Sequence, residues 1–117
     1  MAQLSTHVLD MSRGRPAAGV RIDLYKREGE LRQHLTASTT NADGRTDSPM
    51  LAGEALPTGE FELVFQAGTY FRAQGAALPD PPFLDEVVIR FGIADAAGKY
   101  HVPLLLAPYG YSTYRGS

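Results

Sequence analysis

The sequence EVVIRFGI at residues 86–93 is the clearest indication of the fold class. Its apolar side chains recur at every second position, namely at Val87, Ile89, Phe91 and Ile93. Successive side chains of a strand point to opposite faces, so this spacing predicts a strand with one buried face. The same alternation recurs at residues 20–25 and 60–65. Several short strands of this kind predict an all-β protein, either an antiparallel sandwich or a barrel.

Turn-forming clusters separate the apolar segments, at residues 13–16, 41–44, 56–59 and 79–82. The segment from Ala67 to Ala77 lacks the alternation, and we predict a short helix there. The chain has 117 residues and no internal repeat, which is enough for one hydrophobic core but not for two. We therefore expect a single domain spanning residues 1–117.

The composition excludes several classes of partner. The formal net charge is −2 and no long basic run occurs, so we expect no binding to nucleic acid or to an anionic membrane. Without cysteine the chain has no disulfide and no thiolate ligand or nucleophile, which favours a reducing compartment. Neither a signal-peptide pattern nor an apolar run of ~18 residues is present. We expect a cytoplasmic protein.

The segment YHVPLLL at residues 100–106 predicts a strand that is covered on both faces. Its first, third, fifth and seventh residues form one apolar face, and Pro103 and Leu105 make the opposite face partly apolar as well. Pro103 has no N–H to donate to a ladder, so it requires a bulge, a strand start or an unpaired edge. An apolar outer face often marks a subunit interface, and we therefore expect an oligomer with closed symmetry.

Two of the three histidines fall on this second face. His7 lies opposite Leu4 and Val8 in its segment, and His101 lies opposite the apolar set of residues 100–106. The same parity groups Tyr114 with them if the three strands are neighbours. Histidines in a partly dry cleft can act as base or acid near neutral pH. For a single histidine the commoner alternative is a surface or hydrogen-bonded ring without a chemical role, and His34, beside charged residues, is interpreted that way.

Other catalytic patterns are absent from the sequence. Two histidines without the spacing of a metal motif do not supply the three or four ligands of a zinc site, so we expect no metal. No phosphate-binding glycine loop occurs, nor a Gly-x-Ser-x-Gly nucleophile turn. Arg45 follows the turn at residues 41–44, where it is either a solvated cation or a clamp for an anion.

The closing segment YSTYRGS, residues 111–117, has an unusual composition for a chain end. Chain ends are commonly frayed. This one follows an apolar run and carries hydroxyl groups, two tyrosines and an arginine, so we expect it to be held in place. It either presents donors and a cation to a polar planar ligand or simply packs its aromatic rings.

Three blocks of the sequence resemble the transthyretin-like family, and specifically its enzyme branch, the 5-hydroxyisourate hydrolases. They are LSTHVLD (residues 4–10) with the following GRPA (14–17), TNADGR (40–45), and YHVPLLL (100–106) running on to YRGS (114–117). The final YRGS is the discriminating part, because it resembles the enzymes and not the hormone carriers. The resemblance implies a β-sandwich of two four-stranded sheets with one short helix, assembled as a homotetramer whose channel is lined by His7, His101 and Tyr114.

The resemblance also implies a metal-free and cofactor-free hydrolysis in urate degradation. The six-membered ring of 5-hydroxyisourate would open to 2-oxo-4-hydroxy-4-carboxy-5-ureidoimidazoline. The implied catalytic residues are His7, Arg45, His101 and Ser117, and the implied substrate-binding residues are His7, Arg45, Tyr114, Arg115 and Gly116. We expect His7 to act as base toward water and His101 as partner or acid, or the reverse.

The sequence departs from the family pattern at a few positions, none of them an implied catalytic residue. Ala107 replaces a more usual serine, Lys99 stands where another histidine is common, and residues 83–86 depart from an aromatic-proline pattern. Two alternatives stay open. One is a carrier of a small planar ligand, which would need apolar channel walls and no groups that transfer protons. The other is a purely structural sandwich, which leaves the covered polar face without an explanation.

Overall fold

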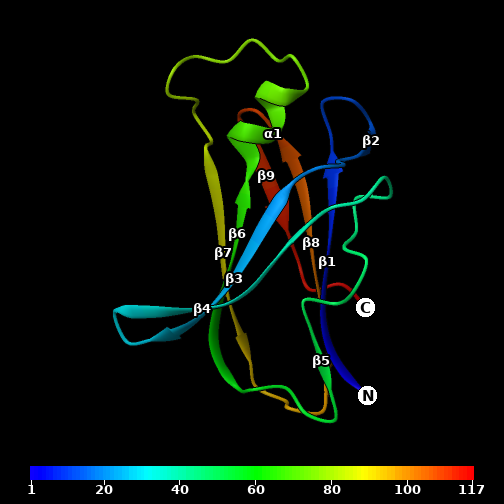
Figure 1. The fold of residues 1–117 in the computed structure, drawn as a ribbon, viewed down its shortest axis with the longest axis vertical. Coiled ribbons are helices and arrows are strands. Elements are labelled where there is room, and N and C mark those ends of the chain that lie inside the picture. Colours follow the sequence, from blue (N-terminus) through cyan, green and yellow to red (C-terminus); the bar gives the residue numbers. More distant parts are fainter.

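The computed structural model describes residues 1–117 (Figure 1). Nine strands form two sheets, and the chain has one helix. The first sheet contains β1 (Ala2–Asp10), β2 (Arg15–Pro16), β5 (Leu51–Gly53), β8 (Lys99–Ala107) and β9 (Gly110–Thr113). The second has the order β4-β3-β6-β7, with β3 at Arg21–Glu28, β4 at Leu31–Thr39, β6 at Gly59–Gln66 and β7 at Glu86–Ile93. The helix α1 (Ala67–Ala73) follows β6 directly.

The predicted sandwich with one short helix is confirmed, with two differences. The first sheet has an additional strand, and its strands β1 and β8 pair in parallel, whereas the alternation alone predicts an antiparallel arrangement. The first sheet has five strands, because β2 and β5 are separate short strands that pair with opposite ends of one edge of β1. β2 pairs with Leu9 and Asp10, and β5 pairs with residues 2–4. The other edge of β1 runs parallel to β8. Together β2 and β5 occupy the place of a single interrupted edge strand.

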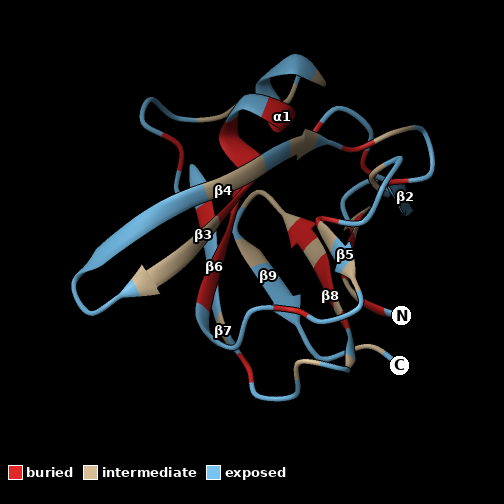
Figure 2. Ribbon diagram, turned by 60° about the horizontal axis from the view of Figure 1, so that its bottom comes forward, coloured by how far each residue is buried: buried red, intermediate tan, exposed pale blue.

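The core lies between the two sheets and comes from the period-two alternation. Along β1, buried and half-buried residues alternate without exception over all nine positions. A cluster of 22 buried residues joins both sheets and includes Phe61 and Phe65 from β6 and Leu104 and Leu106 from β8. Buried stretches of β6 and β8 are red in Figure 2. Each such side chain stabilises the fold by about 1.5–3 kcal/mol through loss of apolar surface. This packing fixes which residues of β1 and β8 must face outward.

The helix α1 lies within the segment from Ala67 to Ala77, where a short helix is predicted, so this prediction is confirmed. It ends at Ala73 because Gly75 adopts a positive φ of 82°. The N–H of Gly75 donates to the carbonyl of Arg72, and that of Ala76 donates to the carbonyl of Phe71, which is the pattern of a glycine-terminated helix end. No helix in the structure combines the length and apolar composition that crossing a bilayer requires.

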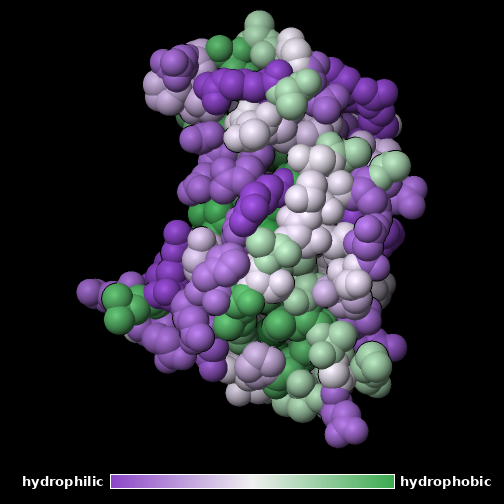
Figure 3. Space-filling model, in the orientation of Figure 1, coloured by the Kyte–Doolittle hydropathy of each residue, from purple (hydrophilic) through white to green (hydrophobic).

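Charged side chains on the outer face of the second sheet contact groups of opposite charge. Glu62 is buried and contacts Arg27, Arg32 and Arg90 at 3.1–3.4 Å. His34 Nε2 lies 2.8 Å from Asp23, whose pKa is lowered mainly by its hydrogen bond with Arg21. Hydrophobic residues gather instead in the lower part of the face shown in Figure 3. The paired state of His34 agrees with its interpretation as a hydrogen-bonded ring without a catalytic role.

Candidate active site

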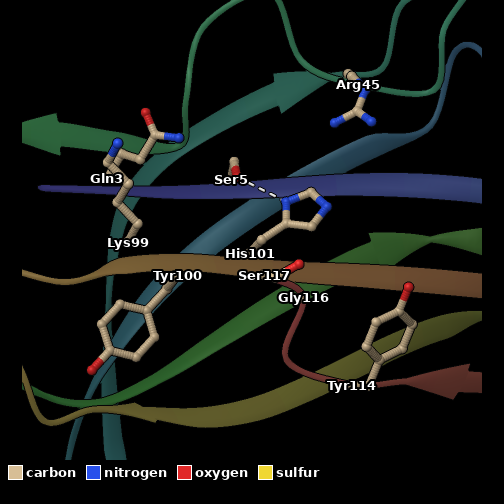
Figure 4. A pocket seen from close by; sticks show the side chains of 9 residues that line it. All are labelled: Gln3, Ser5, Arg45, Lys99, Tyr100, His101, Tyr114, Gly116 and Ser117. Atoms are coloured by element: carbon tan, nitrogen blue, oxygen red, sulfur yellow. Dashed lines mark hydrogen bonds between the residues drawn. The ribbon is translucent and has the colours of Figure 1, made fainter.

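A pocket of about 450 Å³ opens on the outer face of the first sheet, beside β1 and β8 (Figure 4). Its volume lies within the usual range of small-molecule sites. Nine residues line it: Gln3, Ser5, Arg45, Lys99, Tyr100, His101, Tyr114, Gly116 and Ser117. Most of them are polar, and they come from three parts of the chain that lie far apart in sequence.

The parallel register of β1 and β8 places both predicted histidines on the outer face. Ser5 lies opposite His101, and His7 lies opposite Pro103. His7 and His101 are half-buried, whereas their neighbours Thr6, Val8 and Val102 are buried. The predicted common face of the two histidines is therefore confirmed. It follows from the alternation, because inward placement of the apolar residues forces the residues between them outward.

The closing segment reaches the pocket by continuing past the end of β9. β9 pairs antiparallel with β8 up to the pair Leu104–Thr113, and a single bridge in the same register joins His101 to Gly116. The ladder is interrupted between these points, opposite Pro103, which has no N–H to donate. The Gly116 N–H donates to the His101 carbonyl at 2.8 Å and restores the pairing. The end of the chain is thus held in place, as expected, and Tyr114 lines the pocket.

Arg45 is held by a turn that docks on the edge of β1 between β2 and β5. Asn41 organises the turn: its side-chain oxygen accepts from the N–H groups of Asp43 and Arg45, and its own N–H donates to the Arg45 carbonyl. Gly44, with φ of 74°, accepts from the Val8 N–H at 2.8 Å. The backbone of Arg45 forms an isolated antiparallel β-bridge with the backbone of His7. A cation and an imidazole therefore stand side by side at this edge.

The His101 ring is closely packed on two sides. Its Nδ1 lies 2.8 Å from the Ser5 hydroxyl oxygen. A Cβ added to Gly116 would stand only 2.6 Å from the Cδ2 of the ring, so the glycine backbone packs directly against the imidazole. Burial lowers the pKa of His101 below its usual value of 6.5, and the positive charges of Arg45 and His7 lower it further. Both effects favour the neutral form of the ring.

Most of the predicted site residues are brought together. Arg45, His101, Tyr114, Gly116 and Ser117 line the pocket, and His7 stands beside it through its bridge to Arg45.

Arg115 points elsewhere. Its guanidinium lies 4.2 Å from the centre of the Tyr100 ring, and it donates to the Lys99 carbonyl. It lines a separate groove with residues of β7. Arg115 therefore does not line the pocket in which the other predicted binding residues meet.

Sequence reasoning missed four lining residues: Gln3, Ser5, Lys99 and Tyr100. Three of them carried a usable signal, because Gln3 and Ser5 share the parity of His7 and Lys99 shares that of His101. Tyr100 falls on the core-facing side of the alternation and is only 6% exposed, so the alternation does not indicate that it lines the pocket.

The arrangement offers an imidazole, hydroxyl groups and two cations, those of Arg45 and Lys99, around a small polar cavity. Such a set can bind a planar, oxygen-rich molecule, transfer a proton and stabilise a developing negative charge. No three His, Cys, Asp or Glu side chains gather in a group that could hold a metal ion.

Comparisons with known proteins point in one direction. The model of the HIUase/Transthyretin family matches residues 4–116. The 5-hydroxyisourate hydrolase 2 of Rhizobium meliloti is 60% identical over 115 residues, which are 98% of this chain and 96% of that protein. The solved structure of the Klebsiella pneumoniae 5-hydroxyisourate hydrolase has a TM-score of 0.82 and 39% identity over the full length of both chains. The structure of an (S)-allantoin synthase has a TM-score of 0.91 and 40% identity, and the match covers 99% of this chain but only 44% of that longer one.

Proposed function

Because the chain belongs to the HIUase/transthyretin family, we propose that it is a 5-hydroxyisourate hydrolase, an enzyme that opens the six-membered ring of its substrate with water. The observation that carries the proposal is the shared pocket of His101, Arg45 and the closing residues Tyr114–Ser117. It is supported by the 60% identity to a hydrolase of that name over almost the full length of both chains.

The reaction makes three demands on the site. The water oxygen bonds to a ring carbonyl carbon, the adjacent C–N bond breaks, and a proton from water ends on the leaving nitrogen. His7 and His101 share the two proton transfers, each at a typical ~10²–10⁴-fold gain in rate. Burial lowers the pKa of His101 and so favours its neutral form, which is the form that can accept a proton.

The other residues bind the substrate and orient the reacting groups. Arg45 offers a permanent cation with forked donors, which suits a planar oxygen-rich ring and an oxyanion formed during attack. Tyr114 orients the ring from the far side of the pocket, and the Ser117 hydroxyl orients water or an imidazole. Gly116 contributes to the wall through its backbone. The mechanism needs no covalent intermediate.

We further propose that the protein assembles as a homotetramer with the pocket facing a channel between dimers. The outer face of the first sheet also carries half-buried Leu9 and Leu105, which pair with each other further along β1 and β8 and form an apolar area that a second sheet would cover. β7 and β9 lie at the ends of their sheets, where a partner strand can pair. Cytoplasmic location stays a prediction from the sequence.

A carrier of small ligands is the less well supported function. A carrier site without catalysis is expected to have apolar walls, whereas Arg45, Lys99 and His101 converge here on a polar pocket. Keeping these charged groups beside a bound ligand costs desolvation free energy, and a carrier has no reaction that would offset this cost.

The activity is tested by generating 5-hydroxyisourate in situ from urate with urate oxidase. The ultraviolet decay of the intermediate is followed with and without the protein. We expect decay far faster than the spontaneous rate and proportional to protein concentration. A decay indistinguishable from the spontaneous one, with the protein folded, would refute the hydrolase proposal.

The lowered pKa of His101 predicts the pH dependence of kcat/KM. If a neutral His101 is required, activity persists below pH 6.5 and falls only as the pH drops through the lowered pKa. Arg45→Gln removes one cause of the lowering, so the acid limb of the remaining activity should move to higher pH. An acid limb that stays in place in the variant would contradict the electrostatic coupling. NMR titration of the ring gives an independent measurement.

A further inference from the structure

Ser5 carries the one side-chain hydrogen bond that the His101 ring makes within the protein, between its hydroxyl oxygen and Nδ1 at 2.8 Å. The other ring nitrogen points away from Ser5 (Figure 4). None of the functions proposed above uses Ser5, although it lines the same pocket.

The placement of Ser5 follows from the parallel ladder between β1 and β8. Ser5 and His101 are direct partners in its register, 96 positions apart in the chain. Neighbouring strands lie about 4.8 Å apart, so two side chains on one face in register meet at close range. A serine hydroxyl one bond beyond Cβ reaches the near nitrogen of the ring, whereas a longer side chain would overreach it. Both residues also face outward, because their neighbours fill the core.

We propose that Ser5 is a positioning residue for His101: its hydroxyl holds Nδ1 and thereby presents Nε2 to the substrate. The nitrogen that is free to react is set by the hydrogen bond made at the other one. The backbone of Gly116 closes the Cδ2 side of the ring, so Ser5 and Gly116 together leave the Nε2 edge open. This inference rests on the proposed hydrolase function.

The choice of a hydroxyl agrees with the electrostatics of the pocket. A carboxylate at this position would stabilise the imidazolium and raise the pKa of His101. A hydroxyl orients the ring without adding charge, so burial and the Arg45 cation still favour its neutral form. In the tautomer whose Nδ1–H donates to the Ser5 hydroxyl oxygen, the lone pair of Nε2 is free to accept a proton.

The test compares Ser5→Ala with Ser5→Thr in the full-length protein. Loss of the hydroxyl should lower kcat about 10-fold or more with little change in KM, because substrate contacts stay while the ring is misaligned. Ser5→Thr keeps the hydroxyl and should restore most of the activity. Thr39→Ala, which removes a hydroxyl from an exposed position of β4 in the other sheet, serves as the matched control and should behave as wild type.

A spectroscopic readout separates failure of this inference from failure of the proposed function. Long-range ¹H–¹⁵N spectra of the folded protein report the state of Nδ1 and Nε2 of His101 without any substrate. We expect the two nitrogen shifts to change in Ser5→Ala and to return in Ser5→Thr. Unchanged shifts and an unchanged kcat in Ser5→Ala would overturn the role of Ser5. If the wild type is inactive but the shifts respond, the hydrolase function fails while the Ser5–His101 link stands. Should Ser5→Ala unfold, the near-isosteric Ser5→Cys takes its place with the same expected changes.

Discussion

Replacing His101 with alanine is expected to lower kcat by about 10²–10⁴-fold, the range for loss of a group that transfers protons in the transition state. In the proposed mechanism the ring transfers a proton, and it is held by the Ser5 hydroxyl and packed against Gly116. The imidazole is half-buried at the surface of the sandwich and absent from the core, so the fold should persist. The variant is assayed by the decay of 5-hydroxyisourate generated in situ.

His34→Ala is the matched control for this prediction. It removes the same side chain from the other sheet, where the ring is bound to Asp23 far from the pocket. Its kcat should equal that of the wild type. His7→Ala should show a loss of the same order as His101→Ala, because the two rings share the proton transfers. A folded His101 variant with activity within threefold of the wild type would remove His101 from the mechanism.

Replacing Gly116 with alanine is expected to reduce kcat/KM by about 10²-fold, the loss that a displacement of about 1 Å at a reacting group can produce. The added Cβ would stand 2.6 Å from Cδ2 and 3.2 Å from Cγ of His101. Either the ring turns away from Ser5 or the closing segment leaves the sheet edge, and both outcomes disturb the pocket. Steady-state kinetics and the ring nitrogen shifts of His101 distinguish the two.

Gly110→Ala provides the control for the steric argument. A Cβ at Gly110 meets no atom within 4 Å, and Gly110 lies on the same short strand that leads into the closing segment. The substitution should leave kcat/KM unchanged. If Gly116→Ala behaved like Gly110→Ala, the close packing of Gly116 on His101 would have no kinetic consequence, and the role of the closing segment would reduce to its side chains.

The outward placement of the two histidines could be predicted because it needs only local information. Alternation with period two fixes which side of a strand each residue occupies, whatever the partner strands are. The position of Tyr114 followed by the same parity, and the structure keeps that register across the gap at Pro103. The helix lies within the segment predicted to hold one, but its end at Ala73 could not be predicted, because it depends on the hydrogen bonds around Gly75, which alternation does not report.

The side-chain direction of Arg115 could not be predicted in this way. Its guanidinium lies over the ring of Tyr100 and donates to the carbonyl of Lys99, and both of these residues belong to the neighbouring strand β8. The splitting of the edge into β2 and β5 likewise depends on how the loop holding Arg45 docks against β1.

The sequence by itself determined an all-β fold, the faces of its strands and the family resemblance carried by His7, Arg45, His101 and the closing YRGS, which in turn implied the sandwich. Only the tertiary structure decided which of these groups touch. Ser5 meets His101 because β1 and β8 pair in parallel with these two residues in register, although 96 positions separate them. Gly116 meets the same ring because the chain rejoins β8 beyond Pro103. Periodicity is a property of single strands, whereas register is set by the energy of packing two strands together, and the active site is made by register.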